Sequence, residues 1–277
     1  MENANLQYLQ NRAHFYAKEL SQHKILQKYW DRLSLILKGS VARGYADRYS
    51  DIDFVIFTDQ ITKNDIVSEY IKNGLSKRKD GIFLPLNDMW EGHYNLDTYE
   101  NLEAHFTNRD MMAVWEYSNI IIMYDSNKRY GGLLALHTEK LLENIDELIK
   151  NKYIEIQLYI DWMRQPLRRA DVCAAIQYAA HVQRYCCHIL FLLNNQGYPP
   201  DKWLFCYLKE LNIVDYLYMR ITDYSKAICG AGLIKPDMEL TQYDLYVQAS
   251  EIVNEIIHIL KNRYGDCQWI REWYLYA

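Results

Sequence analysis

Residues 37–54 read LKGSVARGYADRYSDIDF, and the interpretation of the whole chain starts from this stretch. The apolar run over 33–37 leads into Gly39 and Ser40, which predicts a buried strand that ends in a glycine turn. A second strand is predicted over 51–57, because its apolar and polar residues alternate at the start. The stretch therefore places a Gly-Ser turn after one strand and an Asp-x-Asp pair at the beginning of the next.

The Asp-x-Asp pair has a specific chemistry. Asp51 and Asp53 are two residues apart on the predicted strand, so their carboxylates point to the same side and repel each other unless a cation lies between them. Mg²⁺ binds carboxylate and phosphate oxygens, and two such ions would bridge a nucleoside triphosphate and an attacking hydroxyl. Gly39 lets the main chain approach a phosphate, and Ser40 offers a hydroxyl and an N–H. Asp-x-Asp alone is usually an exposed strand end, but its combination with Gly-Ser between apolar strands favours a functional site.

This combination resembles the signature of the nucleotidyltransferase superfamily, which has the polymerase-β-like fold. The wording RGYADRYSDID over 43–53 is most similar to the small bacterial group that includes the aminoglycoside and lincosamide nucleotidyltransferases. The close resemblance covers residues 37–54, and the order of elements resembles the family over most of the chain. The resemblance implies nucleotide-binding residues Gly39, Ser40 and Ser50 and metal ligands Asp51 and Asp53.

Members of this family use a third carboxylate on a neighbouring strand. Asp97 is the best candidate, because it lies within a predicted strand over 93–99, where a buried carboxylate without a partner would be costly. It would then be a catalytic residue and a third metal ligand. The alternative is an ordinary aspartate at a strand end. Glu91 is the reserve candidate for a general base that acts on an acceptor hydroxyl.

A lysine in the second half of the chain is a further candidate. Lys202 follows Pro200 and Asp201, which predict a helix start, and a cation in the first turn of a helix is slightly unfavourable. In the antibiotic-modifying enzymes that the chain resembles, a lysine of the helical domain reaches the triphosphate, which implies nucleotide binding by Lys202. The alternative is a solvated surface lysine.

Periodicity outside these motifs predicts two domains of different character. Residues 1–130 form the expected catalytic domain and 131–277 a helical, substrate-binding domain. Strands are predicted over 33–37, 51–57, 82–86, 93–99 and 119–124, and helices over 4–29, 61–75, 102–117, 134–162, 172–194, 202–211 and 245–264. The expected fold class is α+β, with an N-terminal nucleotidyltransferase core built on a mixed sheet and an all-helical C-terminal domain.

Composition restricts the location and the partners. The chain has 31 Lys and Arg against 36 Asp and Glu, a net charge of −5, which disfavours broad binding to nucleic acid. None of the six cysteines forms a CxxC pair, and the N-terminal residues lack the apolar stretch of a signal peptide. No apolar run approaches the length of about 20 residues that a membrane span needs. We therefore expect a cytoplasmic protein, and the oligomeric state is left open.

These observations lead to one expected function and two alternatives. The expected enzyme is a nucleotidyltransferase with two Mg²⁺ ions that transfers AMP from ATP to a hydroxyl of a small molecule and releases pyrophosphate. The acceptor is expected in a cleft between the two halves, and an aminoglycoside-like antibiotic is the first candidate. The identity of the acceptor and whether antibiotic resistance is the role are left open. The first alternative is transfer to protein or RNA, as in toxin–antitoxin systems. The second is a catalytically inactive nucleotide-binding scaffold.

Overall fold

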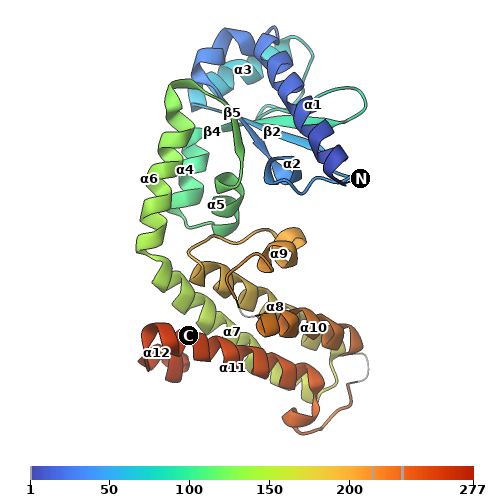
Figure 1. Cartoon of the computed structure of the whole chain (residues 1–277), viewed down its shortest axis with the longest axis vertical. Helices are drawn as coiled ribbons and strands as arrows, with labels where there is room; N and C mark the ends of the chain where they lie inside the picture. The colour runs from blue at the N-terminus through green and yellow to red at the C-terminus, as the bar shows by residue number, and fades with distance from the viewer. Residues whose placement is uncertain (1, 214, 232–233) are drawn as a thin grey trace. The chain divides into compact units, whose positions relative to one another are not determined.

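The computed structural model describes residues 2–213, 215–231 and 234–277 (Figure 1). The chain divides into two compact units, Met1–Leu141 and Leu142–Ala277. The boundary predicted after residue 130 falls at the start of helix α6 (Arg129–Glu143), whereas the units divide near the end of this helix. Each unit has its own buried core.

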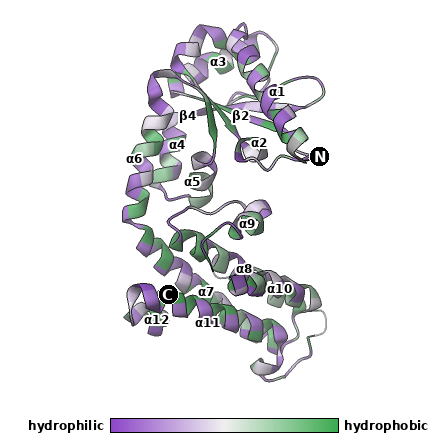
Figure 2. Cartoon of the chain, in the orientation of Figure 1, coloured by the Kyte–Doolittle hydropathy of each residue, from purple (hydrophilic) through white to green (hydrophobic). Residues whose placement is uncertain are grey.

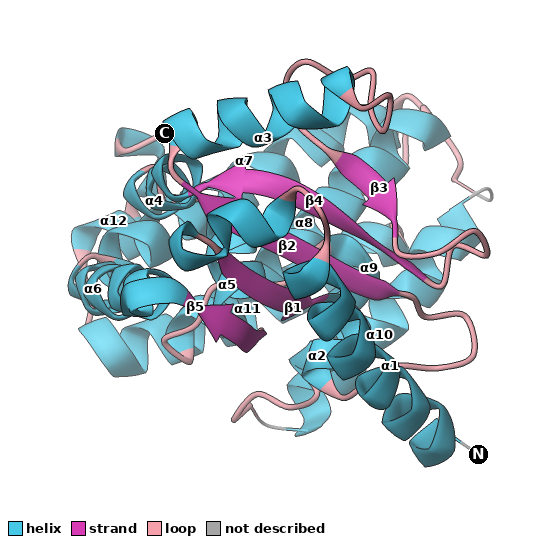
Figure 3. Ribbon diagram, turned by 90° about the horizontal axis from the view of Figure 1, so that it is seen from above, coloured by secondary structure: helices cyan, strands magenta, loops and turns pink. Residues whose placement is uncertain are grey.

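The first unit is built on a mixed sheet of five strands in the order β3-β4-β2-β1-β5 (Figure 3). Strand β2 pairs with β4 in parallel, and the other three strand pairs are antiparallel. The strands are β1 (Ser34–Lys38), β2 (Ile52–Thr58), β3 (Phe83–Pro85), β4 (Gly92–Thr98) and β5 (Ile121–Asp125). This sheet and the helical second unit confirm the predicted α+β fold class.

One face of the sheet packs against helices α1 (Glu2–Gln22) and α3 (Gln60–Lys72). Alternate residues of β2, namely Ile52, Phe54 and Ile56, are buried in this core, as the alternation in the sequence predicted. The central strands appear as a band of apolar residues in Figure 2. Burial of such side chains contributes about 1.5–3 kcal/mol each to folding. Because these side chains point toward α1 and α3, the alternate residues of β2 point to the opposite face of the sheet. Asp53 lies on this second face.

Tyrosines cover part of the second face. The ring centroid of Phe57 on β2 lies 5.3–6.2 Å from the ring centroids of Tyr99, Tyr117 and Tyr130. These come from α4 (Tyr99–Thr107), α5 (Met111–Ser118) and α6. The single helix predicted over 102–117 is two helices, because Arg109 has a φ of 55° and the side chain of Asp110 caps the start of α5.

The second unit is helical. It contains α7 (Ile145–Arg168), α8 (Val172–Leu193), α9 (Asp201–Leu208), α10 (Asp215–Gly230), α11 (Asp244–Tyr264) and α12 (Gln268–Arg271). The helix predicted over 134–162 is divided into α6 and α7 at Asn144, and α10 was not predicted. None of the helices in the described part of the chain combines the length and the apolar character that crossing a membrane requires.

The remaining segments are short and connect these elements. Helix α2 (Gly39–Arg43) joins β1 to the loop before β2. The described part of the chain also has the 3₁₀ segments η1 (Leu26–Arg32), η2 (Ser126–Lys128), η4 (Leu240–Gln242) and η5 (Trp273–Leu275). Helix α2 begins with the Gly-Ser turn and lies between the end of β1 and the loop that leads to β2.

Candidate functional site

The turn after β1 is shaped by two requirements at Gly39. This residue has a φ of +76°, which glycine adopts without steric cost. A Cβ atom at this position would lie 2.1 Å from Oδ2 of Asp53, far inside van der Waals contact. The register explains the proximity, because Lys38 at the end of β1 pairs with Asp53 on β2. A side chain at position 39 would therefore displace the Asp53 carboxylate.

Ser40 and Ser50 lie in different surroundings. Ser40 is buried in the first turn of α2, and its carbonyl accepts a hydrogen bond of 3.0 Å from the N–H of Tyr45. The hydroxyl of Ser50 donates to Oδ1 of Asp47 at 3.0 Å and accepts from the Asp47 N–H at 2.9 Å. The N–H of Tyr49 also donates to this carboxylate, and it is the main reason that the pKa of Asp47 is lowered. In this structure Ser50 shapes the loop that leads to Asp51.

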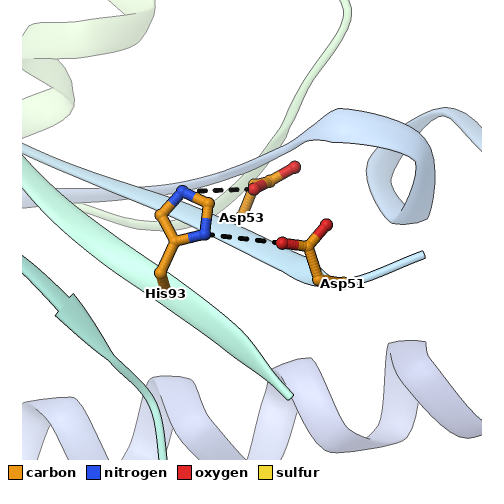
Figure 4. Close-up of side chains that lie close together, drawn as sticks. All are labelled: Asp51, Asp53 and His93. Atoms are coloured by element: carbon orange, nitrogen blue, oxygen red, sulfur yellow. Dashed lines mark ion pairs between the residues drawn. The ribbon is translucent and has the colours of Figure 1, made fainter. Parts of the chain in front are cut away.

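Two carboxylates and an imidazole meet at the beginning of β2 (Figure 4). Nδ1 of His93 lies 3.5 Å from Oδ2 of Asp51, and Nε2 lies 3.3 Å from Oδ1 of Asp53. Among the described residues, these three form a group whose ligand atoms all lie within 4.8 Å of one another. The side chain of Asp51 is 55% exposed, against 21% for Asp53 and 19% for His93. The cluster is thus open to solvent on the side of Asp51.

Strand pairing brings His93 to this place. Asp53 and His93 are partners in the parallel register of β2 and β4. The strands approach closely here, since a Cβ atom on Gly92 would lie 2.3 Å from the carbonyl oxygen of Ile52. The ring of Phe83 on β3 packs against the imidazole, with the two ring centroids 4.4 Å apart. Sequence reasoning missed His93, because a single sequence does not give the register between strands.

The same register corrects the prediction for Asp97. Asp97 lies on β4 as expected, but it pairs with Phe57, four residues farther along the strand than His93. At about 3.3 Å per residue, this places it roughly 13 Å from the level of Asp53. Its Oδ1 accepts hydrogen bonds of 2.8 Å from the N–H of Thr98 and from Nδ2 of Asn101. The structure therefore does not bring Asp97 together with the two aspartates, and His93 occupies the position expected for it.

Glu91 is likewise unsuited to the reserve role of a general base. Its carboxylate accepts hydrogen bonds of 2.8–3.1 Å from the Arg12 guanidinium. The hydroxyls of Tyr8 and Tyr16 donate to it at 2.8 and 2.6 Å, and Asn87 donates at 3.2 Å. Chiefly because of Arg12, the pKa of Glu91 is lowered to about 2. A carboxylate this acidic and this fully bonded is a poor proton acceptor, and its role is to hold α1 against the start of β4.

Lys202 lies in the second unit, on the first turn of α9, and is exposed. Helix α9 begins at Asp201 after Pro200, as the sequence predicted. Asp201 pairs with Arg184 at 2.7 Å. The proposed contact of Lys202 with a triphosphate stays a prediction.

Comparison with known proteins identifies the first unit. The sequence profile of the family described as "Nucleotidyltransferase domain" matches residues 21–112. Residues 21–112, within the first unit, thus match a nucleotidyltransferase domain. The match spans both strands of the Gly-Ser and Asp-x-Asp motif as well as His93, and it confirms the predicted superfamily and enzyme class. It does not distinguish the aminoglycoside-modifying group.

Structural comparison gives a distant similarity. A crystal structure of a nucleotidyltransferase-like protein from Exiguobacterium sibiricum 255-15 matches with a TM-score of 0.46 and 11% sequence identity. The match covers 88% of this chain and 75% of that protein. No curated protein matches the chain.

The residues of the nucleotidyltransferase domain fit a divalent cation. Carboxylate oxygens and an imidazole nitrogen are ordinary ligands of such ions, and three of them converge at Asp51, Asp53 and His93. The absence of a side chain at Gly39 lets the Gly-Ser turn pack directly against the Asp53 carboxylate. The arrangement can therefore hold a cation next to main-chain and hydroxyl groups that suit a phosphate.

Proposed function

We propose that this protein is a metal-dependent nucleotidyltransferase that transfers AMP from ATP to a hydroxyl group of a small molecule and releases pyrophosphate. The fit between Gly39 and Asp53 carries the proposal. An ordinary strand end does not need a glycine whose missing side chain makes room for a carboxylate. Such a glycine is needed in a site where a phosphate lies against the turn and a cation lies against the carboxylate.

Each residue of the turn has a separate task in this proposal. The main chain at Gly39 and the hydroxyl of Ser40 bind the β- and γ-phosphates, with Lys202 as a further phosphate ligand. Asp51, Asp53 and His93 hold the divalent ion. When bound, the ion neutralises phosphate charge and orients the triphosphate. Catalysis by the protein is then mainly positioning of donor and acceptor, as is usual in phosphoryl transfer.

A cationic, sugar-like molecule such as an aminoglycoside is the proposed acceptor. The net charge of −5 supports it, because an acidic protein attracts cations at long range. The exposed side chain of Asp51 adds a carboxylate at the open side of the site. Both observations disfavour RNA as the acceptor.

The first test is ligand-dependent thermal stabilisation. The wild-type protein is melted with each of the four nucleoside triphosphates, with and without a divalent ion, and compared with Asp53→Asn. A ligand at 100 times its Kd stabilises the folded state by about 2.7 kcal/mol, which shifts the melting temperature measurably. We expect ATP with metal to stabilise the wild type and Asp53→Asn to lose this gain.

Asp97→Asn is the matched control, because it removes a carboxylate on the neighbouring strand outside the cluster. It should keep the metal-dependent shift. Transfer is then measured with ATP labelled on the α-phosphate and a panel of aminoglycosides and lincosamides. Label on a protein or RNA instead would overturn the small-molecule acceptor, and the absence of any nucleotide shift would overturn the enzyme and favour the scaffold.

A further inference from the structure

We propose that the cluster selects a first-row transition-metal ion over Mg²⁺, with His93 as a nitrogen ligand beside Asp51 and Asp53. The inference rests on the proposed function, because it concerns the metal of the same site. It goes beyond that function in naming the class of ion and the residue that determines it. Its support comes from distances, strand packing and ligand chemistry.

The distances suit shared ligation. Two ligands that each lie about 2.0–2.2 Å from one ion are separated from each other by roughly 3.0–3.5 Å. Nε2 of His93 lies 3.3 Å from an Asp53 oxygen, which is the spacing of two ligands of one ion, and the other ring nitrogen, Nδ1, lies 3.5 Å from an Asp51 oxygen. One ligand atom from each of Asp51, Asp53 and His93 lies within 4.8 Å of the other two. Charge-assisted hydrogen bonds are shorter, about 2.7–2.9 Å. The imidazole is therefore placed at ligand spacing rather than at the spacing of a charge-assisted hydrogen bond.

The position of the imidazole is built into the sheet. The close approach of Gly92 to Ile52 fixes the spacing of the two strands immediately before His93. Phe83 packs on the ring, and the Glu91–Arg12 bond holds the residues just before Gly92 against α1. The imidazole is thus supported from three elements, as a metal ligand needs to be.

Ligand chemistry determines the preference. Mg²⁺ is a hard ion that favours an octahedral shell of oxygens and retains several waters. An imidazole nitrogen strengthens binding of the later first-row ions, whose affinities rise from Mn²⁺ through Co²⁺ to Cu²⁺. Asp97 lies too far along β4 to replace the imidazole with a third oxygen. The mixed set of two carboxylates and one imidazole therefore favours a later first-row ion such as Co²⁺ over Mg²⁺.

The test uses the whole 277-residue chain without a histidine tag, in four forms: wild type, His93→Asp, His93→Gln and Asp53→Asn. Pulsed electron paramagnetic resonance of bound Mn²⁺ detects coupling to a directly coordinated imidazole nitrogen. We expect this coupling in the wild type and not in either His93 variant. Calorimetric titrations should show Co²⁺ binding at least tenfold more tightly than Mg²⁺ to the wild type. His93→Asp, which restores an all-oxygen set, should reduce that ratio at least tenfold.

The possible failures are distinguishable. If Asp53→Asn abolishes Mn²⁺ binding but the wild type shows no nitrogen coupling, His93 is not a ligand, and the inference fails while the proposed site stands. If Mn²⁺ binding is the same in wild type and Asp53→Asn, and no nucleotide shifts the melt, the proposed function fails as well. Unchanged melting temperatures of the His93 variants without metal show that they fold.

Discussion

At the scale of single residues, the two glycines at the ends of α2 show two different reasons why a position requires glycine. One reason is a left-handed main chain, and the other is the lack of space for a side chain. Gly39 and Gly44 have φ values of +76° and +80°. A Cβ atom at Gly39 would meet the Asp53 carboxylate, whereas nothing lies within 4 Å of one at Gly44. Alanine at either position costs about 1–2 kcal/mol for the left-handed main chain. At position 39 it must also displace a proposed metal ligand.

This difference gives a paired prediction. Gly39→Ala should abolish the metal-dependent shift of the melting temperature with ATP, because the Asp53 carboxylate is pushed aside. Gly44→Ala should destabilise the protein by about 1–2 kcal/mol and keep the shift. Denaturant unfolding and ligand-dependent melting check the two effects separately. Retention of the shift in Gly39→Ala would contradict the proposed role of the turn.

The buried His188 in α8 should make the free energy of unfolding depend on pH. It is 4% exposed and lies flat against Tyr198, with ring centroids 3.6 Å apart. Burial, with smaller contributions from Lys152 and Arg184, lowers its pKa to about 3. The unfolded chain binds a proton here below about pH 6.5, but the folded chain does so only near pH 3. This residue therefore removes stability as the pH falls between these values.

We expect His188 to cost about 1 kcal/mol of unfolding free energy for each pH unit between pH 6 and pH 4. His188→Phe keeps an aromatic ring against Tyr198 and cannot titrate. Its unfolding free energy should fall less steeply over this range than that of the wild type. Urea unfolding at several pH values measures both slopes, and parallel slopes would show that the folded protein accepts the proton readily.

At the scale of elements, one side chain fastens α1 to the site-bearing strand. The Glu91 carboxylate is bonded to Arg12, Tyr8 and Tyr16 on α1, and its main-chain carbonyl accepts from the N–H of Ile52 at 3.1 Å. Because the Glu91 pKa is lowered to about 2, its stabilisation is complete above the ordinary carboxyl pKa of about 4.5 and is lost as the pH falls toward 2.

Glu91→Gln should therefore lower the free energy of unfolding by about 2 kcal/mol at neutral pH, since charge-assisted hydrogen bonds are replaced by weaker ones. The difference from wild type should shrink as the pH falls from 4.5 toward 2. Glu69→Gln is the control, because Glu69 bonds Lys28 and Tyr29 at the surface, where ion pairs contribute little. Equal losses in the two variants would argue against an anchoring role of Glu91.

Much of the order of elements could be predicted, but the pairing between them could not. The alternation in β2 predicted its strand and which residues share a face, and Asp97 was correctly expected in a strand. Only the parallel register shows that His93, and not Asp97, lies opposite Asp53. The split at Arg109 depends on a left-handed main chain that a continuous periodic pattern does not reveal.

Helix α10 and the acidity of Glu91 illustrate the same limit. The buried residues of α10, Leu217, Ile221 and Tyr224, have helical spacing, but polar and aromatic residues around them obscure the pattern. Glu91 looked like an available base because its partner Arg12 lies 79 residues earlier in the chain. Local sequence therefore located the Gly-Ser and Asp-x-Asp parts of the candidate site, and tertiary pairing placed His93 beside them.

At the scale of the whole molecule, the two compact units enclose separate cores. Phe54 and Ile56 are buried among residues of the first unit, whereas Leu190 of α8 is buried in the second. Proteins open locally in cooperative units that follow such cores. A change in one core should therefore alter protection against hydrogen exchange mainly within its own unit.

Leu190→Ala creates a cavity in the second core and should cost about 2–5 kcal/mol, because Leu190 is 1% exposed. Hydrogen exchange measured by mass spectrometry should then speed up in peptides from 142–277 and stay unchanged in those from the sheet. Glu91→Gln should give the opposite pattern. Because the proposed metal cluster lies wholly in the first unit, Leu190→Ala should also leave Mn²⁺ affinity unchanged. Uniform acceleration along the chain in either variant would show that the two cores unfold as one.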